Sequence, residues 1–66
     1  MAGLRNRLKQ YGLDGPTKLA KAIGTSKQYA YQLLRGDAYG VQAAERIAKV
    51  VDLPWHVVYE WQRDGR

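Results

Sequence analysis

The chain has 66 residues, of which 45% are hydrophobic and 26% charged, and it contains no cysteine. This composition argues against a disordered chain, excludes disulfides and thiolate metal sites, and fits a single domain over residues 1–66. No apolar run approaches the ~20 residues that cross a bilayer, and no signal peptide is present, so we expect a soluble, cytoplasmic protein without a membrane partner.

The positive charge is concentrated in the first half of the chain. Residues 1–36 carry seven basic residues and one acid, whereas residues 37–66 carry four basic residues and five acids; the total is +5. Such asymmetry indicates that one face meets a polyanion, although a solvated surface with a chance asymmetry explains the charge equally well.

Glycine and proline divide the chain into five segments whose apolar spacing is helical. The first predicted helix covers residues 2–11, with an apolar stripe of Leu4, Leu8 and Tyr11. The second begins near Pro16, a residue suited to the first turn of a helix, and ends at Gly24. Its predicted buried side consists of Leu19, Ala20 and Ile23.

The third predicted helix covers residues 26–35, with Ser26 as N-cap and Gly36 as C-terminal stop. The fourth covers residues 41–51, and its buried face consists of Ala44, Ile47, Ala48 and Val51. The fifth follows a proline and covers residues 55–63. No segment is a convincing strand, so the predicted fold class is all-α, a compact five-helix bundle.

The second and third helices are separated by a single sharp turn. Gly24 can adopt the left-handed conformation that this turn requires, and Ala20, four residues earlier, lets the third helix approach closely. Apolar residues follow six and nine positions after the glycine, at Ala30 and Leu33. This spacing is the helix-turn-helix signature and indicates that residues 17–36 read DNA; an ordinary helical hairpin is the alternative.

Three stretches of sequence carry a family resemblance. The run PTKLAKAIGTSKQYAYQLLRG resembles the helix-turn-helix of lambda-repressor-like and Cro-like phage regulators, and AAERIAKVVDLP resembles their fourth helix. The opening LRNRLKQYG is most similar to prophage Cro-type repressors and to antitoxin-like relatives of the same fold. The resemblance covers about residues 4–58 and implies a five-helix DNA-binding domain whose second and third helices form the helix-turn-helix.

Two positions depart from the family pattern. Pro16 stands where the family often has a glutamine that grips a phosphate, so Thr17 or a nearby backbone amide must make that contact. Ala30 stands where a branched aliphatic residue is usual, and a tyrosine is expected to fill the remaining space. The first departure leaves one phosphate contact unassigned.

A helical wheel separates the two sides of the third helix. The buried side consists of Ala30, Leu33 and Leu34, and the base-reading candidates are Lys27, Gln28, Tyr31 and Gln32. The resemblance implies that Lys27, Gln28 and Gln32 contact bases. Glutamine can pair with N6 and N7 of adenine, and lysine can donate to guanine or phosphate. The alternative is that these are solvated surface residues.

Phosphate contacts are predicted around this helix, since they supply most of the affinity that is independent of DNA sequence. Backbone amides at the start of the fourth helix are further donors. The side-chain candidates are Thr17, Lys18, Lys21, Arg35 and Tyr39.

Nothing in the sequence indicates catalysis. His56 is the only histidine, and no paired carboxylates, phosphate-cradling loop or metal-ligand spacing accompany it. We therefore expect no enzyme, metal, cofactor or small-molecule substrate.

The fifth helix spreads apolar residues over more than one side. Trp55, Val58 and Tyr59 are expected to pack on the bundle, which would leave Val57 and Trp61 exposed as candidates for a homodimer contact. The alternative is that both complete a small core.

Two functions of different classes remain open at this point. The first is a Cro-like transcriptional repressor that binds a two-fold symmetric double-stranded DNA operator as a homodimer. The second is an antitoxin-like interaction module that neutralises a toxin. The chain has almost no segment after the fifth helix with which to hold a toxin, and this favours the repressor.

Overall fold

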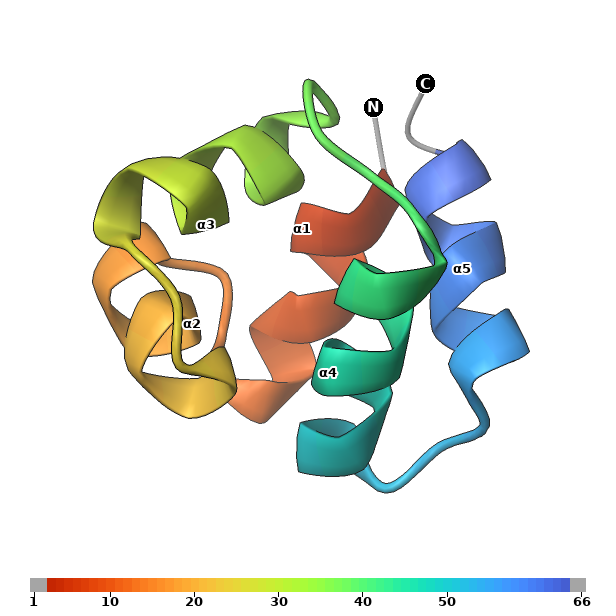
Figure 1. Ribbon diagram of the computed structural model, residues 1–66. Coiled ribbons are helices and arrows are strands. Elements are labelled where there is room, and N and C mark those ends of the chain that lie inside the picture. The colour runs from red at the N-terminus through yellow and green to blue at the C-terminus, as the bar shows by residue number, and fades with distance from the viewer. Residues whose placement is uncertain (1–2, 65–66) are drawn as a thin grey trace.

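The computed structural model describes residues 3–64, and these form five α-helices and no strand (Figure 1). The prediction of a compact, all-α fold with five helices is confirmed. The helices are α1 (Gly3–Leu8), α2 (Pro16–Ile23), α3 (Lys27–Arg35), α4 (Val41–Val51) and α5 (Trp55–Asp64), and a 3-10 turn, η1 (Lys9–Tyr11), continues α1. The Cα atoms extend over 23 × 22 × 21 Å.

Local backbone chemistry sets the ends of α2 and α3. Gly24 ends α2 at φ 70°, and its N–H donates to the carbonyl of Ala20. Two residues later, Ser26 Oγ accepts from the Tyr29 N–H at 3.1 Å and caps α3. Gly36 ends α3 at φ 87°. The predicted cap and both predicted glycine stops are confirmed.

The core lies where the inner faces of the helices meet. In Figure 1, α2 and α3 form one side of the molecule, α4 and α5 the other, and α1 lies between them. The buried sides predicted for α2, α3 and α4 are confirmed, and Tyr29 packs partly against the core that Ala30 joins. The buried hydrophobic residues are Leu4, Leu8, Leu19, Ala20, Ile23, Ala30, Leu33, Leu34, Ala43, Ala44, Ile47, Ala48, Val51, Val58 and Trp61.

The first helix is shorter than predicted. It ends at Leu8, and the chain tightens into η1, which has fewer residues per turn than an α-helix. This change of winding carries Tyr11 off the stripe of Leu4 and Leu8, so Tyr11 is exposed rather than buried. The expected start of the helix at residue 2 lies outside the described residues.

The buried side of α5 also differs from the prediction. Trp61 is only 8% exposed and lies in the core, Val57 is half-buried, and Trp55 is 41% exposed. The reason is that α1 packs against α5, and the guanidinium carbon of Arg7 lies 5.9 Å from the centre of a Trp61 ring. The expectation that Val57 and Trp61 form an exposed pair for dimer contact is therefore wrong.

Gln62 is the one buried polar side chain among residues 3–64. Its Oε1 accepts from the Gly40 N–H at 3.3 Å. Gly40 immediately precedes α4, so this bond ties the loop after α3 to the far end of α5.

The conformation of Gly24 predicts a measurable cost of substitution. A Cβ there would meet nothing within 4 Å, so Gly24→Ala introduces only the strain of a left-handed alanine. We expect a loss of about 1–2 kcal/mol in the free energy of unfolding, measured by urea denaturation. Gly15 has φ −105° and caps α2 without a side-chain hydrogen bond, so Gly15→Ser should instead stabilise by about 0.5–1 kcal/mol. Equal effects of the two changes would contradict this conformational difference.

Candidate functional site

The exposed side of α3 carries a row of polar side chains. Gln28 and Gln32 lie one turn apart, and Tyr31 is about half exposed between them. Lys27 is exposed at the start of the helix. All four predicted base-reading residues therefore share the solvent-facing side of one helix, where they present amide, hydroxyl and ammonium groups.

The orientation of this polar row is set by the residues that fix α3 against the core. Ala30, Leu33 and Leu34 are buried, so rotation of α3 about its axis would expose apolar surface. The Ser26 cap and the left-handed Gly24 fix the direction in which α3 leaves α2. The polar row is thus held by a packed core and not by a mobile loop.

Arg35 ends the row and already has two neighbours. Its guanidinium carbon lies 5.5 Å from the centre of the Tyr31 ring, and its Nε lies 3.4 Å from Oδ2 of Asp37. Sequence reasoning missed this ion pair because Asp37 lies beyond the end of α3. Both side chains are more than half exposed, so the pair contributes little stability and an incoming anion can replace the carboxylate.

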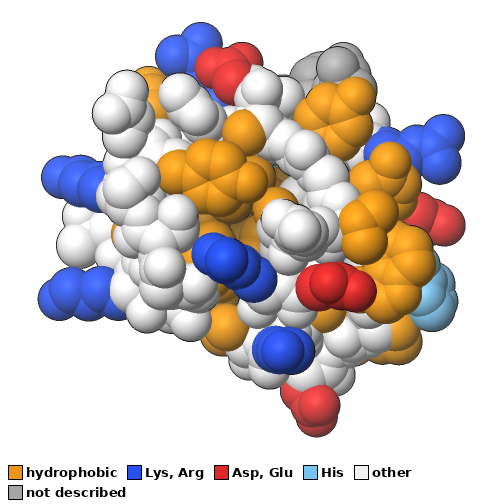
Figure 2. All heavy atoms as spheres, in the orientation of Figure 1, with side chains coloured by type: hydrophobic (Ala, Val, Ile, Leu, Met, Phe, Trp, Pro, Cys, Tyr) orange, Lys and Arg blue, Asp and Glu red, His pale blue; other side chains and the backbone are white. Residues whose placement is uncertain are grey.

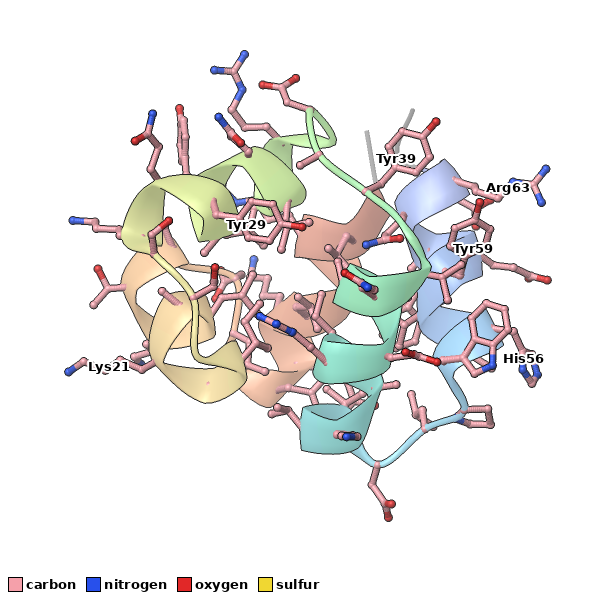
Figure 3. The ribbon with its side chains drawn as sticks, viewed as in Figure 1. Lys21, Tyr29, Tyr39, His56, Tyr59 and Arg63 are labelled. Carbon is pink, nitrogen blue, oxygen red and sulfur yellow. The ribbon has the colours of Figure 1, made fainter. Side chains whose placement is uncertain are left out.

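The three candidates on α2 are exposed. Thr17 and Lys21 lie one turn apart, and Lys21 points away from the body of the molecule (Figure 3). Within residues 3–64, Arg35–Asp37 is the only ion pair, so Lys18, Lys21 and Lys27 have no carboxylate partner there. These ammonium groups are available to an external polyanion.

Tyr39 lies apart from the other phosphate candidates. It is 44% exposed and belongs to the loop between α3 and α4. In Figure 3 its ring lies beside α5, on the opposite side of the view from Lys21. The structure therefore brings the α2 and α3 candidates to one side of the molecule and leaves Tyr39 on another.

A further cation lies close to the turn between α2 and α3. Arg46 of α4 lines a hollow of about 290 Å³ together with Thr25 of the turn, Tyr29 and Gln42. The sequence does not indicate that Arg46 lies near this turn, because Arg46 belongs to the near-neutral half of the chain and reaches the turn only through helix packing.

The surface charge also differs between the side formed by α2 and α3 and the side formed by α4 and α5. In Figure 2, basic side chains project from the side formed by α2 and α3, with no acidic side chain next to them. The acidic side chains in that view lie at the top, at the bottom and over α4 and α5. The polar row of α3 thus lies on the more positive side of the molecule.

No group of three His, Cys, Asp or Glu side chains within residues 3–64 could hold a metal ion. None of the helices in that range has the length and apolar character needed to cross a membrane. When the chain was compared with known proteins, no family model, no curated protein and no solved structure matched it.

Proposed function

We propose that this chain is a sequence-specific double-stranded DNA-binding protein of the Cro-like repressor type, in which α2 and α3 act as a helix-turn-helix. The observation that carries the proposal is the exposed row Lys27, Gln28, Tyr31 and Gln32, in which the two glutamines stand opposite the buried side of α3. At about 1.5 Å per residue, the nine residues of α3 span about 14 Å, a length that the major groove accommodates.

In this proposal, the two glutamines of α3 contact bases, and the nearby lysine and arginine side chains contact the phosphate backbone of the DNA. Gln28 and Gln32 can each donate and accept toward an adenine edge, which a charged or apolar side chain cannot do. Lys18 and Lys21 of α2, with Thr17, flank α3 and contact phosphates. Arg35 exchanges its exposed Asp37 partner for a phosphate. Repression follows from occupying an operator, and a homodimer would bind two symmetric half-sites.

The second candidate is an antitoxin-like interaction module that binds another protein. The exposed apolar side chains of Val41 and Val50 on α4 and of Trp55 on α5 are the observation that favours it, because large exposed apolar groups mark protein contacts. The two candidates differ in one property that is simple to measure. Only the first requires the α2–α3 side to bind duplex DNA.

Salt dependence tests the electrostatic part of the proposal. Contacts with roughly five to eight phosphates give a slope of about −4 to −7 in a plot of log affinity against log salt concentration. We expect this slope for a random-sequence duplex, measured by fluorescence anisotropy. Lys21→Ala should reduce its magnitude by about one.

Arg63→Ala is the matched control, since it also removes one positive charge. Figure 3 places Arg63 on α5, on the opposite side of the view from Lys21, so the slope should not change. A flat salt dependence of the unmodified chain would contradict the proposal. Equal losses from both variants would show that general charge, and not the α2–α3 side, determines binding.

A further inference from the structure

The hollow between the α2–α3 turn and α4, which we call the Arg46 hollow, is lined by hydrogen-bond donors. Its lining consists of Thr25, Tyr29, Gln42, Ala43 and Arg46, and no carboxylate of residues 3–64 belongs to it. The guanidinium, the two hydroxyls and the amide group can all donate. A volume of about 290 Å³ corresponds to about ten water molecules of the liquid, so the hollow admits a phosphate group together with several waters.

Arg46 is available to a ligand in this hollow. Its side chain is exposed, and no ion pair, hydrogen bond or aromatic contact within residues 3–64 engages it. Thr25 and Tyr29 are half-buried beside it, so the fold already restricts the side chains that carry the two hydroxyls. A guanidinium matches a phosphate especially well, because its planar fork can donate two parallel bonds to two oxygens.

The Arg46 hollow lies on one flank of the polar row of α3. Successive residues of a helix turn by about 100°, so Tyr29 and Tyr31 lie on nearly opposite sides of α3, with the two glutamines between them. Figure 3 shows the Tyr29 side chain extending from α3 toward α4. The other flank carries Tyr31, and the guanidinium carbon of Arg35 lies 5.5 Å from the centre of its ring. Each flank of the row therefore has an arginine beside a tyrosine.

The shape of the major groove gives these two flanks different DNA strands. The groove is about 12 Å wide, and an α-helix with its side chains is about 10–12 Å across, so a helix that enters the groove fills its width. The two edges of the groove are formed by the phosphates of different strands. A helix in the groove consequently has one strand along each flank.

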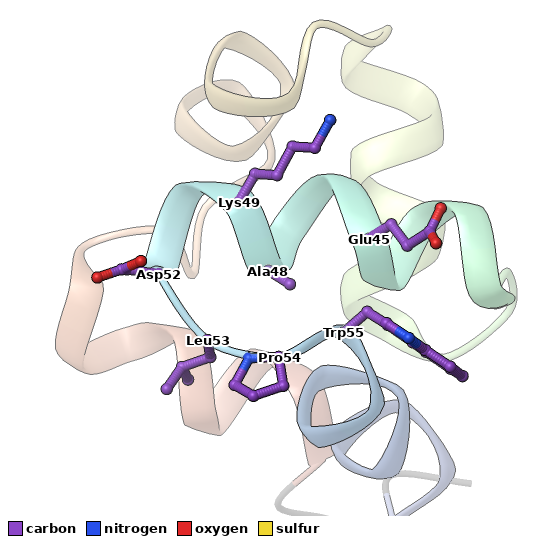
Figure 4. A pocket seen from close by; sticks show the side chains of 7 residues that line it. All are labelled: Glu45, Ala48, Lys49, Asp52, Leu53, Pro54 and Trp55. Carbon is purple, nitrogen blue, oxygen red and sulfur yellow. The ribbon is translucent and has the colours of Figure 1, made fainter.

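A second groove that involves α4 has the opposite electrostatic character. It lies between α4 and the start of α5, and its volume is about 620 Å³ (Figure 4). The carboxylates of Glu45 and Asp52 line it together with the ammonium group of Lys49. Two carboxylates and one cation disfavour a phosphate. Affinity for an anion is therefore expected of the Arg46 hollow and not of α4 as a whole.

We infer that the Arg46 hollow binds a backbone phosphate of one DNA strand, while Arg35 binds a phosphate of the other strand. The inference rests on the proposed function and adds to it a contact from α4. The Arg46 guanidinium donates to the two non-bridging oxygens of the phosphate, and the hydroxyls of Thr25 and Tyr29 complete the site. Contacts on both flanks prevent α3 from rolling in the groove, which keeps its glutamines against the base edges.

Arg46→Gln tests the contact through the salt dependence of binding to a random-sequence duplex. Loss of one phosphate contact should reduce the magnitude of the slope of log affinity against log salt by about one, and weaken binding roughly eightfold at about 0.1 M salt. Arg63→Gln is the matched control, because it makes the same replacement on α5, on the far side of the view from α2 and α3 in Figure 3. It should change neither quantity. Arg46 is exposed, so the thermal unfolding of Arg46→Gln should equal that of the unmodified chain.

Neutral methylphosphonate groups identify the strand that each arginine contacts. The probe is the duplex that the unmodified chain enriches from a random pool, with its phosphates replaced one at a time on either strand. Replacement at the contacted phosphates should weaken binding by the unmodified chain on both strands. Arg46→Gln should lose this sensitivity on one strand only, and Arg35→Gln on the other strand only, because a contact that is already missing cannot be lost again.

Three results would overturn the inference. They are an unchanged salt slope for Arg46→Gln, equal slope reductions for Arg46→Gln and Arg63→Gln, and loss of sensitivity on the same strand for Arg46→Gln and Arg35→Gln. A flat salt dependence of the unmodified chain would instead overturn the proposed function itself.

Discussion

Trp61→Ala is expected to leave the chain largely unfolded at 25 °C. Trp61 is one of the two tryptophans and the one that lies in the core, where it packs between α5 and α1. Removing a buried tryptophan side chain costs about 3–5 kcal/mol. A 66-residue chain is stable by only about 3–10 kcal/mol, at roughly 0.05–0.15 kcal/mol per residue. The loss is therefore comparable to the whole free energy of unfolding.

Trp55→Ala is the matched control for this prediction. It removes the same side chain from a position that is 41% exposed, and we expect a cost below about 1.5 kcal/mol at protein concentrations where the chain is monomeric. Urea denaturation followed by circular dichroism measures both variants. A well-folded Trp61→Ala, or equal losses from the two changes, would contradict the packing of α5.

The structure of α2, α3 and α4 could be predicted from interactions that act within a few residues of the sequence. Gly24, Ser26 and Gly36 set the ends of α2 and α3, and each does so through its own backbone conformation or side chain. The apolar spacing of α4 left one face that could be buried. These elements were predicted correctly because the decisive interactions lie within one or two helical turns.

The orientation of α5 could not be predicted in this way. Its apolar residues surround the helix, so spacing alone does not choose between a buried Trp55 and a buried Trp61. The choice is made by α1, about 50 residues earlier in the sequence, which packs against α5. The position of Arg46 near the turn likewise depends on contacts between elements, whereas the Arg35–Asp37 ion pair depends on the path of the chain just after α3.

Removal of either α3 glutamine is expected to weaken recognition of one or two base pairs. Gln28→Ala or Gln32→Ala deletes both hydrogen bonds that an exposed amide can make to adenine, and such a contact discriminates by about 1–3 kcal/mol, or roughly 5–150-fold. Affinity for random DNA should barely change, since neither side chain carries charge. Competition titrations at fixed salt, with operator and random duplexes, measure both quantities.

Gln10→Ala is the matched control for the glutamine variants. Gln10 is an exposed glutamine in η1, outside α3, and its Nε2 donates to the carbonyl of Arg7 at 3.3 Å. This variant removes the same chemical group from a helix that the proposed function keeps outside the groove. Base preference should therefore equal that of the unmodified chain.

Selection from a pool of randomised DNA duplexes tests the central claim most directly. The unmodified chain and Gln10→Ala should enrich one common site, whereas Gln28→Ala and Gln32→Ala should lose preference at different base pairs within it. That pattern would assign base reading to the exposed side of α3. Enrichment of no site by the unmodified chain, or recovery of the same site by both α3 variants with preference unaltered at every position, would contradict it.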